Sequence, residues 1–268
     1  MEQVKKLREM TGAGVMDCKK ALEATEGDFP KAIEFLRRKG IAASANREAR
    51  EAKEGLITLY VQDHQGAMVE LNCETDFVAR TEDFQKLAAE FAKKVFDAGE
   101  KVVSQEESLN RVRELSGKVG EKMVLRRGVR LEAKEGFIAF YLHSNKKIGV
   151  LAVVQGNKSN EAVNLCGKDI AMQIAASRAL FVSREEIPTE ILEREREVFH
   201  TEMAGKPREI QEKIIQGKSE KWFEEVCLLD QRFIKNEDLK VKDYVAEIGQ
   251  KAGQKVTVRR FVRFELGG

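Results

Sequence analysis

The stretch "EGLITLYV" (Glu54–Val61) recurs 81 residues later as "EGFIAFYL" (Glu135–Leu142), and this repetition decides the fold. The likeness continues in the same order, because "GAMVEL" returns as "GVLAVV" and "LAAEFA" returns as "IAMQIA", each at an offset of 83. A last pair, "GEKMVLRRGVRLEA" and "GQKVTVRRFVRFEL", stands 133 residues apart. The chain therefore contains two copies of one unit, and the second copy holds about fifty additional residues between Ile170 and Gly253.

Each unit is predicted to form a small antiparallel sheet with helices on one face. The β-rich runs "LITLYV" and "AMVELN" are joined by the polar turn "QDHQG", as in a hairpin. The segment that follows has apolar residues at helical spacing, namely Phe84, Leu87, Ala88, Phe91 and Val95. A distant third strand, "KMVLRRGVRLEA", completes the unit. The predicted fold class is α+β, with a core N-subdomain over residues 54–134 and a core C-subdomain over residues 135–268.

The first forty residues are predicted to form a compact three-helix bundle. Three short stretches with apolar residues on one side each end at a glycine, namely Gly12, Gly27 and Gly40. Asp28 is placed as an N-cap of the third helix, and Pro30 lies in its first turn. Residues 41–53 are rich in alanine and charge, so they are predicted to link the bundle (residues 1–40) to the core.

The additional residues of the second copy are predicted to form an antiparallel helical hairpin at about 185–228. Two helical patterns, "TEILEREREVFHTEM" and "REIQEKIIQGKSEKWFEEVCLL", are separated by the turn "AGKP". Their spacing predicts an apolar seam in which three residues of the first helix face three of the second: Ile191, Val198 and Phe199 against Ile210, Ile214 and Trp222.

Composition excludes several classes of protein. The net charge of +2 is too balanced for a protein that coats nucleic acid. No apolar run approaches the roughly 18–20 residues that cross a bilayer, so no membrane contact is expected. The four cysteines form no CxxC pair and the three histidines lie far from them in sequence, so no metal site is expected. Free thiols without a signal peptide predict a cytoplasmic protein.

Recognisable catalytic machinery is missing from the sequence. The glycine pair in "TGAG" (Thr11–Gly14) is not followed by GK[ST], so it is interpreted as a turn between helices and not as a phosphate loop. Neither GxSxG nor HExxH occurs. The acid pair Glu106–Glu107 lies in charge-rich helical sequence, where solvation is the simpler interpretation. The sequence therefore predicts a protein that is not an enzyme and has no cofactor.

Two features leave alternatives open. Phe77 follows two polar residues in "NCETDFVAR", so it either packs in the core or stands exposed for a partner. The strands "LRRGVR" and "VRRFVR" alternate arginine with apolar residues, and Arg126, Arg259 and Arg263 could face RNA phosphates. Half-buried strands with a charged solvent face are the alternative, favoured because these strands lack clustered aromatic residues for base stacking.

Four motifs together resemble bacterial elongation factor Ts. They are "VKKLREMTGAGVMDCKKAL" near the N-terminus, "TDFVAR", "IGVLAVV" and "DIAMQIAAS", in the family's order. The resemblance implies a guanine-nucleotide exchange factor that binds elongation factor Tu in its GDP-bound and nucleotide-free forms. It also implies a ubiquitin-associated-like N-terminal domain, a two-part core, an inserted antiparallel coiled coil, no direct contact with the nucleotide, and a possible 2:2 assembly.

The resemblance also assigns roles to residues at matching positions. The motif residues expected to disturb the Mg²⁺ site of elongation factor Tu are Thr75, Asp76, Phe77 and Val78. The N-terminal face expected to dock on a helix of its GTPase domain comprises Arg8, Val15, Met16 and Lys19. Contact with its third domain is expected from His143. A further partner contact of the core C-subdomain is expected at Ile234, although Lys235 stands where family members often have methionine.

Overall fold

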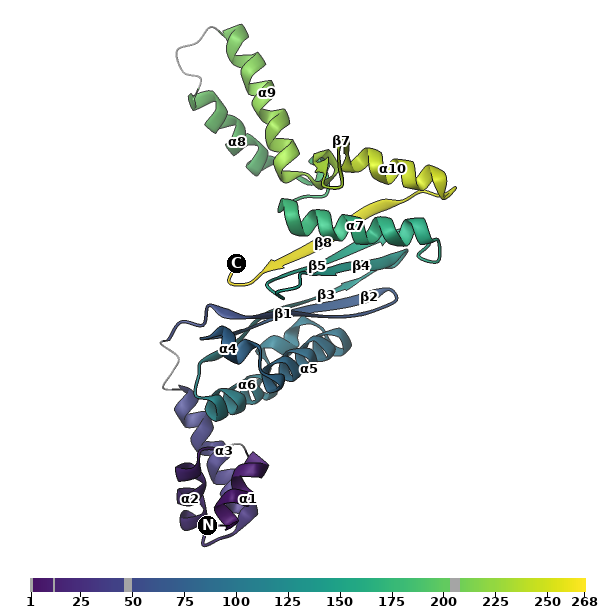
Figure 1. The fold of residues 1–268 in the computed structure, drawn as a ribbon. Coiled ribbons are helices and arrows are strands. Elements are labelled where there is room, and N and C mark those ends of the chain that lie inside the picture. The colour runs from purple at the N-terminus through teal and green to yellow at the C-terminus, as the bar shows by residue number, and fades with distance from the viewer. Residues whose placement is uncertain (1, 12, 46–49, 203–207) are drawn as a thin grey trace. The chain divides into compact units, whose positions relative to one another are not determined.

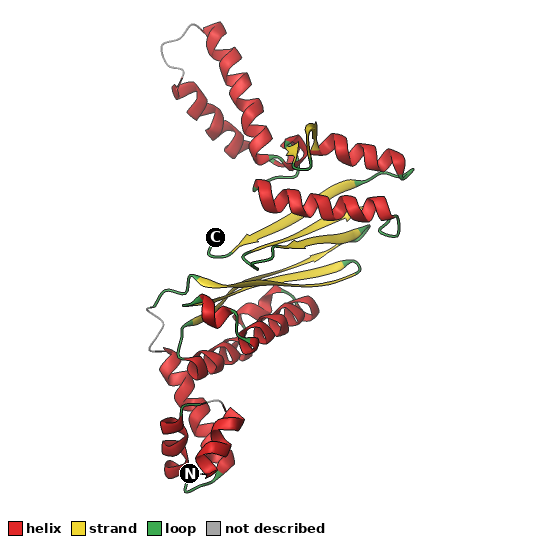
Figure 2. Ribbon diagram, viewed as in Figure 1, coloured by secondary structure: helices red, strands yellow, loops and turns green. Residues whose placement is uncertain are grey.

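The computed structural model describes residues 2–11, 13–45, 50–202 and 208–268, with helices and strands as labelled in Figure 1. The chain divides into two compact units, each built around one three-stranded sheet. The first unit contains the residues up to Tyr60, Ala67–Arg130 and Glu265–Gly268, and the second contains Val61–Gly66 and Leu131–Phe264. The predicted α+β class is confirmed: three helices come first, followed by antiparallel sheets with helices (Figure 2).

The N-terminal helices are α1 (Glu2–Thr11), α2 (Val15–Ala24) and α3 (Phe29–Ala45). They enclose a small apolar core of Leu7, Cys18, Ala21, Leu22 and Ala32. The predicted end of the third helix at Gly40 is wrong, because α3 continues to Ala45. A glycine inside a helix costs only about 1 kcal/mol, and the alanine-rich residues after it favour helix. Residues 41–45 of the predicted linker are therefore helical, and residues 46–49 lie outside the described part of the chain.

The sheet of the first repeat has the strand order β1-β2-β3. Its strands are β1 (Glu54–Gln62), β2 (Gln65–Cys73) and β3 (Met123–Glu132), and β3 lies beside β2 although some fifty residues separate them. The helices of this repeat are α4 (Asp76–Ala79), α5 (Glu82–Ala98) and α6 (Glu106–Val119), with a 3₁₀ turn at Glu100–Ser104. Phe84 and Phe91 of α5 are fully buried in the core between helices and sheet.

The second repeat has the same plan, with the strand order β4-β5-β8. Its strands are β4 (Phe137–Leu142), β5 (Ile148–Gln155) and β8 (Thr257–Glu265), and β4 pairs antiparallel with β5. Its helices α7 (Glu161–Ser177) and α10 (Val241–Lys251) pack on one face and share the buried core. The duplication predicted from the repeated motifs is thus present in the strand order of both sheets.

The repeated "EG" has a physical reason in both copies. Gly55 has φ +140° and Gly136 has φ +93°, conformations that side chains rarely allow. A Cβ atom would lie 2.2 Å from the carbonyl oxygen of Leu71 in the first copy and 2.0 Å from that of Val154 in the second. No residue but glycine fits at either position without moving the neighbouring strand.

The additional residues of the second repeat form the expected helical hairpin, α8 (Thr189–Glu202) and α9 (Arg208–Val226), which lie side by side in Figure 1. Short elements follow at Leu228–Asp230, β6 (Arg232–Phe233) and β7 (Asn236–Lys240). The predicted seam is wrong in part: Ile191, Val198 and Ile210 are exposed, and Ile215 is buried in place of Ile214. The seam residues were assigned from spacing alone, which leaves the rotation of each helix about its axis undetermined.

The base of the hairpin is held by hydrogen bonds and by ion pairs between side chains. The backbone N–H of Leu228 donates to the carbonyl of Phe181 at 2.9 Å, so the two flanks of the insertion meet. Arg184 donates to Asp230 at 2.9 Å and to Glu220 on α9 at 2.8 Å. Both bonds raise the pKa of Arg184, which stays charged and joins α9 to the end of the insertion.

Candidate functional site

The position of Phe77 answers the first open question of the sequence. Phe77 lies in the single helical turn α4 and is 79% exposed, more than any other large apolar residue described. The next residue, Val78, is only 8% exposed and packs with Ala79 into the core of the first repeat. Of the four motif residues expected to meet a partner, Val78 therefore acts as the anchor of the turn, while Phe77 projects from it.

The start of this turn is fixed by Thr75 and Glu121. The Thr75 hydroxyl accepts a hydrogen bond from the backbone N–H of Val78 at 3.4 Å, which caps α4. The same hydroxyl donates to Glu121 Oε1 at 2.6 Å, and the Thr75 backbone N–H donates to Glu121 Oε2 at 3.0 Å. Beside them, burial raises the pKa of Cys73 to about 12, so its thiol stays protonated and donates to the Thr75 carbonyl at 3.1 Å.

The end of the turn is set by a second threonine. Thr81 caps α5 by accepting from the backbone N–H of Phe84 at 3.4 Å, and its hydroxyl donates to the carbonyl of Val78 at 2.8 Å. At the offset of 83 that relates the two repeats, Phe77 corresponds to Asn160, which caps the unbroken helix α7. The first repeat is thus interrupted between α4 and α5 where the second repeat has the continuous helix α7, and Phe77 lies in the short turn before the interruption.

Asp76 lies on the solvent side of the turn. Its carboxylate accepts from Arg80 at 2.7 Å across one helical turn. The pair is exposed, so it contributes little to stability in water. Both charges are available to a partner that approaches Phe77.

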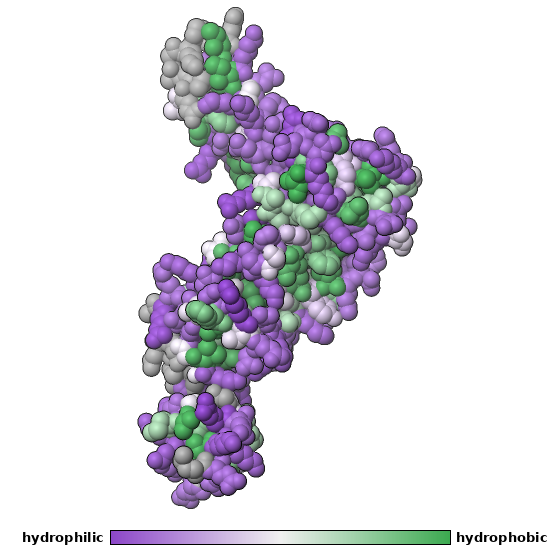
Figure 3. Space-filling view, in the orientation of Figure 1, coloured by the Kyte–Doolittle hydropathy of each residue, from purple (hydrophilic) through white to green (hydrophobic). Residues whose placement is uncertain are grey.

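A second expected surface lies on α1 and α2. Arg8, Val15, Met16 and Lys19 are all exposed, and Met16 is 62% exposed. Sequence reasoning missed Met10, which is 59% exposed. Its step of three from the buried Leu7 is a spacing that favours the core face, yet the side chain is exposed near the end of α1. Figure 3 shows green apolar areas among purple hydrophilic atoms on the bundle.

The two residues expected to make partner contacts from the core C-subdomain lie in the second unit. Ile234 is 43% exposed at the turn between β6 and β7, and its backbone N–H donates to Gln173 Oε1 at 2.8 Å. The neighbouring Lys235 is half-exposed and donates to the buried Asp169 at 2.6 Å. Tyr244 donates to the same carboxylate at 2.8 Å. The turn that carries Ile234 is therefore held from below by side chains of α7 and α10.

His143 follows β4 and is half-buried. Its Nδ1 lies 2.9 Å from the hydroxyl of Tyr141, and its backbone N–H donates to the carbonyl of Ile148 at 2.9 Å. These bonds hold the ring at the end of the strand.

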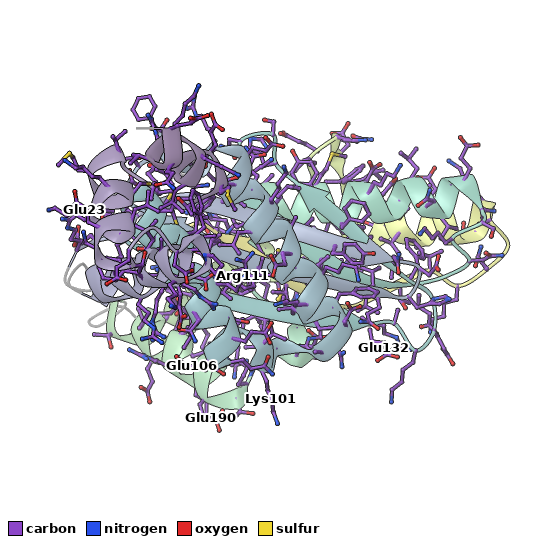
Figure 4. The ribbon with its side chains drawn as sticks, turned by 90° about the horizontal axis from the view of Figure 1, so that it is seen from below. Glu23, Lys101, Glu106, Arg111, Glu132 and Glu190 are labelled. Carbon is purple, nitrogen blue, oxygen red and sulfur yellow. The ribbon has the colours of Figure 1, made fainter. Side chains whose placement is uncertain are left out.

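Several charged groups outside these surfaces are paired with one another. Glu106 accepts from Arg113 at 2.7 Å and Glu107 accepts from Lys94 at 2.9 Å, both at the surface. Arg111, labelled with Glu106 in Figure 4, donates to Glu90 at 3.1 Å. Within the described ranges, no three His, Cys, Asp or Glu side chains gather as metal ligands. None of the described helices is long and apolar enough to cross a bilayer.

Four arginines of β3 and β8 donate hydrogen bonds within the protein. Arg126 donates to the carbonyl of Gly268 at 3.1 Å, and Arg127 pairs with the buried Glu70 at 2.7 Å. Arg259 donates to Gln155 at 3.0 Å, and Arg263 donates to the carbonyl of Ala175 at 3.2 Å. These contacts favour half-buried strands with a charged face over a free RNA-binding row.

Comparison with known proteins agrees with this geometry. The family model "Elongation factor TS" matches residues 74–268. The chain is 44% identical to elongation factor Ts of Aquifex aeolicus, over 100% of this chain and 98% of the relative. It is 42% identical to that of Prosthecochloris aestuarii, over 99% and 98%, and 41% identical to one from Clostridium botulinum, over 99% and 92%. The chain belongs to the elongation factor Ts family.

The elongation factor Ts family consists of nucleotide exchange factors for elongation factor Tu, and not of catalytic enzymes. The resemblance drawn from the four motifs is therefore confirmed, as is the assignment to translation elongation. The expected cytoplasmic location agrees with this membership. The comparisons assign no role to any single residue, so the site residues stay predictions.

Proposed function

We propose that this protein releases GDP from elongation factor Tu by pressing Phe77 against the region that holds Mg²⁺ and the phosphates. The observation that carries the proposal is the 79% exposure of Phe77 on a turn whose two ends are capped and whose next residue is buried. A large apolar side chain exposed on a capped turn is suited to anchor a partner, because the backbone that carries it is already ordered before binding.

The proposed mechanism is a shift between two states of the GTPase. GDP is held by a phosphate-binding loop together with Mg²⁺, so its release requires these contacts to open. A factor that binds the open form better than the closed form shifts the equilibrium toward opening. By linkage, returning nucleotide must weaken the factor to the same degree, which makes exchange reversible. No residue of this chain needs to touch GDP, and Asp76 acts on local charge near the metal.

The bundle supplies affinity in this proposal. The side chains of Val15 and Met16 present apolar surface to a helix of the GTPase domain, while Arg8 and Lys19 flank it with positive charge. This pattern, an apolar centre with charged surroundings, suits a helix that is amphipathic and acidic at its edge. The bundle, predicted over residues 1–40, is proposed to be ubiquitin-associated-like.

A third proposed contact surface lies in the core C-subdomain. His143 is proposed to contact the third domain of elongation factor Tu, and Ile234, on the turn held by α7 and α10, is proposed as a further partner contact. The proposal also includes a coiled-coil character of the hairpin α8–α9 and a 2:2 assembly. It keeps the predicted bounds of the two subdomains, residues 54–134 and 135–268. Lys235 is bound to Asp169 and so is not assigned to the partner.

The test is the release rate of fluorescent GDP from elongation factor Tu with and without this protein. We expect acceleration that saturates with the concentration of the factor. Salt-dependent binding to RNA, with no effect on GDP release, would favour the alternative function through the arginine strands instead.

A further inference from the structure

The loop before Phe77 and the loop after α6 hold each other through two carboxylates. Glu121 accepts from the backbone N–H and the hydroxyl of Thr75. In return Glu74, the residue before Thr75, accepts from the backbone N–H of Lys122 at 2.6 Å. Lys122 in turn donates to the carbonyl of Arg50 at 2.7 Å. Adjacent residues of one loop are thus joined to adjacent residues of the other.

Glu121 determines which way the Thr75 hydroxyl points. A hydroxyl has one hydrogen to donate and two lone pairs to accept with. The 2.6 Å contact with the Glu121 carboxylate takes that hydrogen, since an ionised carboxylate only accepts. The lone pairs of Thr75 are left for the backbone N–H of Val78, which begins the turn that carries Phe77.

Glu121 is itself held in place by α6. Gly120 ends α6 in the left-handed conformation, with φ +89°, and turns the chain toward Thr75. The buried hydroxyl of Ser116 donates to the carbonyl of Glu121 at 2.6 Å. Because α6 packs into the core of the first repeat through Val112, the carboxylate is tied to the rigid part of the unit.

We propose that Glu121 is a positioning residue that sets the direction of Phe77, an inference that rests on the proposed function of Phe77. Its carboxylate connects the core helix α6 to the cap of α4, so the exposed ring keeps one orientation before a partner arrives. A misplacement on the order of 1 Å can lower the rate of a reaction by up to about 100-fold, so a small rotation of α4 would matter.

The two carboxylate oxygens of Glu121 accept from two donors of Thr75, so this position requires a side chain with two acceptor oxygens. Glutamine at position 121 offers one oxygen, so either the N–H or the hydroxyl of Thr75 loses its acceptor. Glu121→Ala removes both acceptors. We expect the maximal acceleration of GDP release to fall about tenfold for Glu121→Ala and less for Glu121→Gln, with the half-saturating concentration nearly unchanged.

A double-mutant cycle with Phe77→Ala separates positioning from simple loss of structure. If Glu121 acts through Phe77, Glu121→Ala lowers exchange in the wild-type background but has little further effect in the Phe77→Ala background. Equal losses in both backgrounds would overturn the proposal. The matched control is Glu100→Ala, which removes a carboxylate that accepts from the backbone N–H of Arg130 at 3.2 Å, away from α4; it should leave exchange unchanged.

Amide hydrogen exchange of the free protein gives a readout that needs no partner. The amides of Thr75 and Val78 should exchange faster in Glu121→Ala, while those of the buried helix α5 should not. Faster exchange at these amides together with normal GDP release would refute the positioning role. If Phe77→Ala itself releases GDP normally, the proposed function of Phe77 fails first, and that result is independent of the amide measurement.

Discussion

Phe77→Ala tests the proposed function most directly. The substitution removes the ring but leaves the caps of α4, because Thr75 and Thr81 bond through their own hydroxyls. Since 79% of Phe77 is still exposed in the free protein, about four-fifths of the roughly 1.5–3 kcal/mol from burying a Phe side chain remains to be gained on binding.

That fraction amounts to about 1.2–2.4 kcal/mol of interaction with the partner. If all of it is realised in the opened state of elongation factor Tu, acceleration of GDP release should fall between roughly eightfold and sixtyfold. Stability should change by less than about 0.5 kcal/mol, because the ring has few neighbours to lose. The melting temperature should therefore move by no more than about 2 °C.

Phe84→Ala is the matched control, seven residues further along the chain. Phe84 is fully buried in the same core, so its truncation should cost about 3–5 kcal/mol of stability. Both variants are measured for melting temperature and, at low temperature, for GDP release. A Phe77→Ala protein with a large loss of melting temperature and normal GDP release would refute the proposed contact and place the ring in the protein's own core.

Two further substitutions and one segment replacement test the fold that holds these surfaces. For Asp230, burial alone would raise the pKa, but the bonds with Arg184 outweigh it and lower the pKa; this stabilisation is present above the unfolded pKa of about 3.9 and is lost as the pH falls through the lower folded value. Asp230→Asn should therefore lower the melting temperature at pH 7, with a difference from wild type that shrinks below about pH 4; a constant difference would contradict the ion pair. Replacing 189–224 by a short Gly/Ser linker should leave a cooperative melting transition, since the flanks are already hydrogen-bonded, and loss of that transition would place the hairpin in the core. Gly136→Ala should lower the midpoint of urea unfolding by well over the effect of an exposed substitution, because the Cβ would meet the carbonyl of Val154; an unchanged midpoint would show that the strand shifts freely.

The duplicated sheets could be predicted because internal repetition reports on three-dimensional structure without any knowledge of packing. The third strand of each unit was recognised by its likeness to the other copy, although it lies far from its partners in sequence. The end of α3 could not be predicted in the same way. Gly40 is a frequent helix terminator, yet the alanine-rich residues after it continue the helix, and local patterns do not weigh these opposing preferences.

The candidate site was predictable only in part for a similar reason. The polar neighbours of Phe77 favoured exposure, whereas the caps Thr75 and Thr81 were found only in the structure. Glu121 could not be predicted either, because its contact with Thr75 spans 46 residues and depends on the turn at Gly120. Nothing in sequence spacing distinguishes it from the other surface glutamates of α6 and its neighbourhood.

The interruption between α4 and α5 is a difference between two repeats that otherwise share one strand order. The second half has a continuous helix after the Asn160 cap. The first half is interrupted between α4 and α5, and the two short ends are capped by threonines. In a protein with a single copy of the repeat, the same interruption would change the only core. Because the chain has two copies, the change is confined to one half. The loop before α7 in the other half is therefore a place where a second exposed aromatic residue could be introduced.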